Sequence, residues 1–297
     1  MKSNAEAAVL TPARARTADF VALAKPRLNL LVVASALAGY AMAGGDLSQV
    51  SQVVATIVGT ALVAGGASAY NQILERRTDA LMLRTRLRPL PDGRLQVGDA
   101  LVFATALSAL GLGTLAAGVN TLCAMVALAT LLSYVVVYTP LKRATSFATV
   151  IGAIPGALPP VIGWTAGRED LGQGAWLLFG IVFLWQLPHF LAIAWMFRED
   201  YARGGFPMLP VLEPDGRSTG RQAVIYTAAL IPLSLAPTLI GLTGRTYFVG
   251  ALALAAIFMT LTARFAMSRS RLDARRLFFG SIIYLPLLWI LMIANRV

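Results

Sequence analysis

Three oxygen-bearing side chains recur at four-residue intervals near the end of a long apolar stretch: Asn71, Glu75 and Asp79. Residues four apart on an α-helix lie on the same face, so these side chains form one stripe about 12 Å long. Amide and carboxylate oxygens suit a hard divalent cation such as Mg²⁺, and a helix C-terminus favours positive charge. The alternative interpretation is that Glu75 and Asp79 only form ion pairs with neighbouring arginines.

Two basic segments accompany this stripe. Arg84 and Arg88 follow it in the chain, and Tyr138-Thr-Pro-Leu-Lys142-Arg143 comes at the end of a later apolar stretch. Guanidinium groups bind phosphate through paired hydrogen bonds, so arginines beside a Mg²⁺ stripe indicate a diphosphate ligand. Each of these residues also fits an ordinary role at a membrane interface, as a basic loop residue or an interfacial aromatic.

A second acidic pair, Glu199-Asp200, follows the segment Gln186-Leu-Pro-His189-Phe. Two acidic groups that share Mg²⁺ ions across a diphosphate would clamp a phosphoryl group. His189 is the single histidine of the chain. A histidine within a membrane span is a functional candidate; the alternative is that its ring is bonded to a helix backbone.

Nine apolar stretches position these residues, and each is long enough to cross a hydrocarbon core of roughly 30 Å as a helix. Of the 297 residues, 57% are hydrophobic and 13% are charged, which argues against an ordinary soluble enzyme. One cysteine and one histidine exclude an internal disulfide and any site that needs several cysteines or two imidazoles. The predicted spans are 26–44, 52–74, 99–117, 119–138, 147–166, 174–197, 222–242, 246–267 and 277–295.

The sequence therefore predicts an all-α bundle of about nine transmembrane helices. Prolines inside the spans indicate kinked helices around a central cavity. Residues 1–20 are expected to form a disordered cytoplasmic tail and residues 21–297 a single transmembrane domain. Nearly all of the 25 Lys and Arg residues lie in this tail and in alternate loops, so we expect the N-terminus in the cytoplasm and the C-terminus outside. The candidate site then lies at the cytoplasmic side, where the net charge of +11 fits anionic lipid or substrate rather than nucleic acid.

These motifs together resemble the UbiA superfamily of intramembrane prenyltransferases. Asn71-x3-Glu75-x3-Asp79 is similar to its first acidic motif, with Glu75 in place of the usual Asp, and Tyr138-x3-Lys142 is similar to its Tyr-x3-Lys motif. The second acidic motif departs further, because Glu199 and Asp200 are adjacent rather than four apart. Within the superfamily, residues 21–290 resemble the protohaem IX farnesyltransferases. The segments that carry this narrower resemblance include Lys25-Pro26-Arg27, Asp79-Ala-Leu-Met82-x-Arg84-Thr85-x2-Arg88-Pro89, Pro188-His189-Phe190 and Pro207-Met-Leu-Pro210.

The resemblance implies transfer of farnesyl from farnesyl diphosphate to the 2-vinyl group of protohaem IX (haem B), which gives haem O for haem–copper oxidases. It implies a protein of the bacterial cytoplasmic (inner) membrane, surrounded by lipid, with haem A synthase as a downstream partner. Haem B is then a substrate, and Mg²⁺ is the cofactor. The implied metal ligands are Asn71, Glu75, Asp79 and Asp200, with Glu199 as a further candidate. The implied substrate-binding residues are Arg84, Arg88, Tyr138, Lys142 and Arg143 for the diphosphate, and His189 for haem or an ordered water.

Two other functions remain open from the sequence. One is a different UbiA-type aromatic prenyltransferase that makes a quinone precursor, against which the Pro-His-Phe and Pro-Met-Leu-Pro segments argue. The other is a secondary transporter. Transporters usually place polar residues near the bilayer centre, whereas here the polar residues crowd the ends of the spans.

Overall fold

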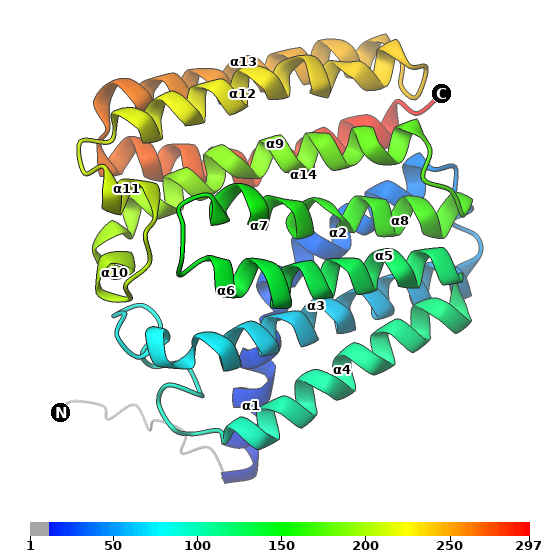
Figure 1. Ribbon diagram of the computed structural model, residues 1–297. Coiled ribbons are helices and arrows are strands. Elements are labelled where there is room, and N and C mark those ends of the chain that lie inside the picture. The colour runs from blue at the N-terminus through cyan, green and yellow to red at the C-terminus, as the bar shows by residue number, and fades with distance from the viewer. Residues whose placement is uncertain (1–11) are drawn as a thin grey trace, which may run out of the picture.

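The structure, a computed structural model, describes residues 12–297. Nine of its helical segments are long and apolar enough to cross a membrane, which confirms the predicted number of spans and a multi-pass membrane protein. They lie side by side in one bundle, with the connections gathered at its two ends (Figure 1). In chain order the nine segments are Arg16–Met42, Val50–Asp79, Val97–Gly118, Thr121–Leu141, Ala148–Arg168, Gln173–Met196, Arg217–Leu239, Arg245–Ser268 and Arg271–Ala294.

Several spans contain more than one helix. The helices are α1 (Pro12–Ala24), α2 (Pro26–Met42), α3 (Val50–Asp79), α4 (Val97–Gly118), α5 (Thr121–Leu132), the π-helical η1 (Ser133–Tyr138), α6 (Thr139–Leu141), α7 (Ala148–Ala157), α8 (Pro159–Arg168), α9 (Gln173–Met196), α10 (Arg198–Arg203), α11 (Leu209–Leu212), α12 (Arg217–Leu239), α13 (Arg245–Ser268) and α14 (Arg271–Ala294). The fifth span divides at Leu158 because Pro159 and Pro160 follow it, and proline cannot continue the helical hydrogen-bond pattern.

Helix α1 begins at Pro12, inside the segment that we expected to be a disordered tail up to residue 20. Contacts with residues far away in the chain explain why this segment is helical. The ring of Phe20 packs against Phe103 of α4, with 5.0 Å between the ring centres. In addition, the Arg94 guanidinium forms an ion pair of 3.0 Å with Asp19. Such tertiary contacts stabilise a helix that its local sequence only weakly favours. Residues 1–11, the rest of the expected tail, lie outside the described residues.

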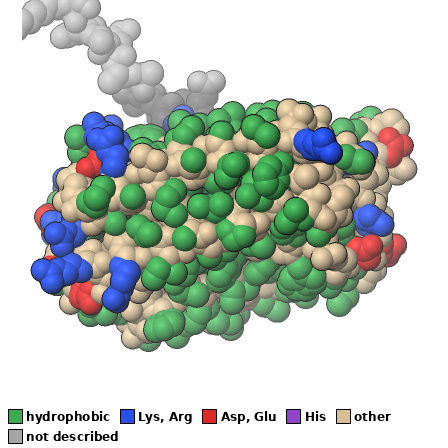
Figure 2. Space-filling view, turned by 90° about the horizontal axis from the view of Figure 1, so that it is seen from above, with side chains coloured by type: hydrophobic (Ala, Val, Ile, Leu, Met, Phe, Trp, Pro, Cys, Tyr) green, Lys and Arg blue, Asp and Glu red, His purple; other side chains and the backbone are tan. Residues whose placement is uncertain are grey.

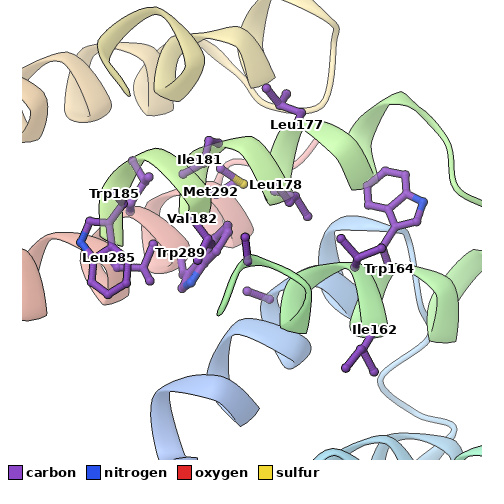
Figure 3. Close-up of a cluster of buried hydrophobic side chains, with 14 of the residues drawn as sticks. Ile162, Trp164, Leu177, Leu178, Ile181, Val182, Trp185, Leu285, Trp289 and Met292 are labelled. Carbon is purple, nitrogen blue, oxygen red and sulfur yellow. The ribbon is translucent and has the colours of Figure 1, made fainter. Parts of the chain in front are cut away.

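The helices form a closed ring of neighbours. Helix α2 contacts α3, α8 and α14, and α9 contacts α7, α12 and α14, while α13 packs between α12 and α14. Between α8, α9 and α14 lies an apolar core that includes Trp164, Trp185 and Trp289 (Figure 3). The Trp185 indole N–H donates to the Ser281 carbonyl oxygen at 2.9 Å, so this buried polar group is satisfied inside the bundle.

Helices α2 and α8 meet backbone to backbone because glycine occupies both sides of their contact. A Cβ atom at Gly163 would overlap the carbonyl group of Ala36, and a Cβ atom at Gly39 would overlap that of Pro160. Small residues allow this close approach between membrane helices, where van der Waals packing drives association.

We expect Gly163→Ala to lower the melting temperature of the purified protein, because the added methyl group forces two backbones apart. Overpacking of this kind costs about 1–3 kcal/mol. Thermal unfolding in detergent measures the effect. Gly113→Ala on α4 is the matched control, since a Cβ there meets nothing within 4 Å. Equal melting temperatures for the two variants would contradict the close contact.

Basic side chains gather at one end of the bundle. We call this the basic end, and it comprises the connections 80–96, 142–147, 197–216 and 269–270 (Figure 1). On the face that Figure 2 shows, Lys and Arg side chains cluster toward this end, while hydrophobic side chains cover the middle of the bundle. The acidic and basic motifs from the sequence lie at or beside the basic end.

Candidate active site

The predicted stripe is present on the last three turns of α3. Asn71, Glu75 and Asp79 share one face, and all three are buried, with exposed fractions of 4%, 2% and 0%. The Asn71 amide nitrogen donates to the Thr139 hydroxyl of α6 at 3.2 Å. The four-residue spacing therefore delivers two carboxylates and an amide into the protein interior rather than to the membrane surface.

Each carboxylate of the stripe pairs with one of the predicted basic residues. The Lys142 amine lies 3.2 Å from Glu75, and the Arg88 guanidinium lies 2.7 Å from Asp79. Ion pairs of the kind that the alternative interpretation requires thus exist, but the carboxylates are buried and their partners lie nine residues (Arg88) and 67 residues (Lys142) away in the chain. Although burial of the Lys142 amine opposes its charged form, the Glu75 carboxylate raises the pKa of Lys142, so this amine stays protonated.

Aromatic rings enclose the Lys142 amine on another side. Its nitrogen lies 4.6 Å from the centre of the Phe206 ring and 5.8 Å from that of Tyr201. Cations are attracted to aromatic faces, and the attraction is stronger where water is excluded. The charge of Lys142 is therefore held in a defined position between α3 and the connection that contains α10.

One oxygen of Asp79 has no partner. Its Oδ2 atom binds Arg88, whereas Oδ1 is buried without a hydrogen bond from any described residue. Such an atom is costly in an apolar interior and calls for an explanation, such as an ion or a ligand that the site binds. A carboxylate oxygen of this kind, in line with Glu75 and the Asn71 amide, fits a divalent cation with oxygen ligands.

Lys25 is a further member of the site, and sequence reasoning did not assign it a role there. It occupies the break between α1 and α2 in the left-handed conformation, with φ 48° and ψ 54°. Its amine is close enough to Glu75, Asp79, Arg88 and Lys142 for electrostatic interaction with all four. The site therefore holds three basic side chains around two carboxylates, which is an excess suited to an anionic ligand.

Hydrogen bonds fix the break that carries Lys25. The Gln72 amide on α3 donates to the Leu23 carbonyl oxygen at 2.8 Å, and the Asn29 amide donates to the Ala24 carbonyl oxygen at 2.7 Å. Left-handed backbone is strained for a non-glycine residue and is often found at functional sites. The Lys25-Pro26 step, a charge directly before a proline at a helix start, was the available signal in the sequence.

The second acidic pair is placed differently from the first. Asp200 accepts the backbone N–H groups of Leu83 at 3.2 Å and of Arg84 at 3.3 Å, and Arg203 approaches it at 3.1 Å. It thereby anchors the connection that follows α3, and its neighbour Glu199 is exposed. Among the side chains of residues 16–297, no three His, Cys, Asp or Glu form a metal-binding group.

Two predicted diphosphate-binding arginines lie away from the stripe. The Arg143 guanidinium donates to the Leu74 carbonyl oxygen at 2.9 Å, on the exposed side of α3. That of Arg84 lies over the Phe197 ring at 5.2 Å. Both residues hold surrounding elements in place.

Tyr138 ends the π-helical turn η1, and its ring lies against Gly152 of α7. Its phenol is near enough to Glu75 for electrostatic interaction. Tyr138 therefore borders the acidic stripe, as its predicted role requires. Single π-helical turns are frequent at functional sites, because they turn a side chain that a regular helix would direct elsewhere.

His189 belongs to a separate aromatic cluster between α9 and α14. Its Nδ1 atom lies 2.6 Å from the Ser281 hydroxyl, and its ring stacks with Trp185 and Phe278 at 5.5 and 5.0 Å. The His189 ring therefore contacts the side chain of Ser281 and not a helix backbone, as the alternative interpretation had it. Its Nε2 atom makes no hydrogen bond with the described residues, so it can still receive a ligand.

Comparisons with known proteins agree with this geometry. The UbiA prenyltransferase family matches residues 32–285. A protoheme IX farnesyltransferase of Solibacter usitatus (strain Ellin6076) is 48% identical over 287 residues, which cover 94% of this chain and 98% of that protein. A protoheme IX farnesyltransferase of Koribacter versatilis (strain Ellin345) is 43% identical over 288 residues, which cover 94% of this chain and 93% of that protein. The solved structure of a UbiA homologue from Archaeoglobus fulgidus bound to GPP and Mg²⁺ shares the fold, with a TM-score of 0.65 at 18% identity over 92% of this chain and 99% of that one.

Proposed function

The chain belongs to the UbiA prenyltransferase family, and we propose that it transfers farnesyl from farnesyl diphosphate to the 2-vinyl group of protohaem IX. The C1–oxygen bond of the diphosphate breaks, and the terminal vinyl carbon bonds to C1. Water then adds to the remaining carbon of the vinyl group and releases a proton, which gives haem O and diphosphate. The observation that carries this proposal is the buried stripe of Asn71, Glu75 and Asp79, with three basic side chains around it.

This chain's residues supply binding and charge stabilisation rather than a nucleophile. Lys25, Arg88 and Lys142 bind the diphosphate oxygens, and the Tyr138 phenol donates a hydrogen bond to them. Asn71, Glu75 and Asp79 hold Mg²⁺, which when bound neutralises the charge that develops on the leaving group. We assign Asp200 a positioning role, since both of its oxygens already accept backbone N–H groups of the connection after α3.

The apolar bundle contributes the other half of the chemistry. It binds the farnesyl chain and keeps water away from the allylic cation until the vinyl carbon has attacked. His189, held at Nδ1 by Ser281, presents Nε2 to haem or to the water that completes the product. The aromatic rings stacked on His189 provide an apolar surface for a porphyrin.

The distribution of charge supports an orientation in the bacterial cytoplasmic membrane. The basic end faces the cytoplasm, in line with the bias of Lys and Arg toward cytoplasmic loops, which places the C-terminus outside. Farnesyl diphosphate then enters from the cytoplasm, and haem enters from the lipid or the same side. The product passes to a haem A synthase as the next partner.

The test is a direct assay of the purified protein in lipid nanodiscs with farnesyl diphosphate, haem B and Mg²⁺. We expect haem O, identified by its mass after extraction, and no product when EDTA removes the metal. A parallel reaction offers 4-hydroxybenzoate as acceptor. Prenylated 4-hydroxybenzoate without haem O would assign the chain to quinone-precursor synthesis instead, and no transfer to either acceptor would contradict the proposal.

A further inference from the structure

A polar pocket opens at the basic end, beside the acidic stripe. It has a volume of about 300 Å³ and lies among the ends of α9 and α10 and the turn between α13 and α14. Four arginines and two carboxylates line it: Arg198, Arg203, Arg269, Arg271, Glu199 and Asp200. None of the residues of the acidic stripe lines this pocket, so it needs its own explanation.

The charges of this pocket are only partly balanced. Arg203 forms an ion pair with Asp200 at 3.1 Å, and Arg198 lies over the Trp195 ring at 4.6 Å. The side chains of Arg269 and Arg271 make no ion pair or hydrogen bond with any residue in 12–297. Two guanidinium groups are therefore available for an anion, and guanidinium matches the planar geometry of a carboxylate.

The backbone of Arg269 distinguishes it from an ordinary basic loop residue. It ends α13 in the left-handed conformation, with φ 50°, and the two-residue turn 269–270 leads directly into α14. Glycine is the usual residue in this position, and an L-residue there costs roughly 1 kcal/mol. An arginine at this strained position, beside a pocket, indicates that its side chain has a function in that pocket.

The pocket and the His189 cluster lie at different depths along helices α9 and α14. On α9, Met196 at the pocket is seven residues beyond His189, a distance of roughly 10 Å along the axis. On α14, Arg271 at the pocket is seven residues before Phe278, whose ring stacks on His189 at 5.0 Å. Helices α9 and α14 contact one another, so both sites lie along one pair of packed helices.

A ligand that uses both sites has an acidic edge and a flat apolar body. We propose that Arg269 and Arg271 bind the two propionate carboxylates of protohaem, so that its ring extends along α9 and α14 toward His189. The vinyl groups, on the ring edge away from the propionates, then lie deeper in the bundle, where water is scarce. This inference rests on the proposed function and adds to it the orientation of the acceptor.

The test compares Michaelis constants for the two substrates in nanodiscs of phosphatidylcholine alone. For the double variant Arg269→Gly/Arg271→Gln we expect the KM for haem B to rise at least tenfold and the KM for farnesyl diphosphate to stay unchanged. Glycine suits the backbone at position 269, so the variant should keep its melting temperature. Arg217→Gln is the matched control, because Arg217 lies at the same end, pairs with Asp215 and does not line the pocket.

Haem B dimethyl ester, which lacks the carboxylate charges, completes the experiment. The KM of the wild type for the ester should match the KM of the double variant for haem B. The double variant should bind the ester no more weakly than the wild type does. Unchanged KM values for haem B would overturn the inference. The inference would also be overturned if added phosphatidylglycerol changed the KM for haem B and the KM for its ester equally, since the pocket would then bind a lipid headgroup. A wild type that makes no haem O would instead refute the proposed function.

Discussion

Asp79→Asn should lower the turnover of farnesyl transfer by about 100-fold or more. The substitution keeps the shape of the side chain and one oxygen that can accept from Arg88, but it removes the charge and one of the two carboxylate oxygens. In the structure Oδ1 is buried without a partner among the described residues, which leaves this atom free to bind a metal ion. Loss of one charge-stabilising contact in a buried site typically costs 10²–10³ in rate.

The measurement is haem O formation across a Mg²⁺ titration, with melting temperatures to confirm folding. Raised Mg²⁺ should restore part of the activity if Asp79 acts by holding the metal. Asp92→Asn is the control, because Asp92 lies in the connection after α3 and pairs with Arg94 outside the site. Wild-type turnover of Asp79→Asn at ordinary Mg²⁺ would remove Asp79 from the metal site.

The second large effect concerns Lys25. We expect Lys25→Met to reduce kcat/KM for farnesyl diphosphate by about 100-fold, because it removes one of three basic groups around the stripe that would bind the diphosphate. A hydrogen bond to a charged group contributes about 1.5–3 kcal/mol, which corresponds to a factor of roughly 10 to 150.

Lys25→Gly separates the side chain from the backbone. Glycine adopts the left-handed conformation of this position without strain, so the break between α1 and α2 should form as before. We expect the same loss of activity as in Lys25→Met, while Arg27→Gln, an exposed change two residues away, should retain wild-type kinetics. Full activity in Lys25→Gly would show that this amine does not contact the diphosphate.

The parts of the site that follow from helix geometry could be predicted from the sequence. Asn71, Glu75 and Asp79 share one face because residues four apart on any α-helix do so, whatever surrounds them. The number of spans likewise followed from apolar length alone, since the thickness of the hydrocarbon fixes it.

Other parts depend on backbone irregularities that local patterns do not reveal. Lys25 reaches the stripe because a left-handed residue separates two helices, whereas the sequence predicted a disordered tail up to residue 20 and a first span that begins at residue 26. A π-helical turn ends at Tyr138, and Arg143 beyond it binds the exposed side of α3. Spacing rules assume regular helices, so they place such residues correctly only by chance.

The second acidic motif shows a different limit. Its composition predicted a metal ligand, and the structure adds that Asp200 accepts two backbone N–H groups from a connection more than a hundred residues earlier in the chain. Whether a carboxylate meets a cation or an amide depends on which segments fold against it, and adjacent residues do not encode this.

The two buried ion pairs of the site also bear on how the products leave. Without a ligand, Glu75 and Asp79 are neutralised by Lys142 and Arg88 from the chain itself. In the proposed mechanism these partners would exchange when the metal and the diphosphate bind, so that the acids would face the metal and the basic groups the phosphates. Once diphosphate departed, the original pairs would re-form and compensate for the contacts that are lost. Such an exchange would let the enzyme bind a highly charged substrate in an apolar interior without trapping the diphosphate after each turnover.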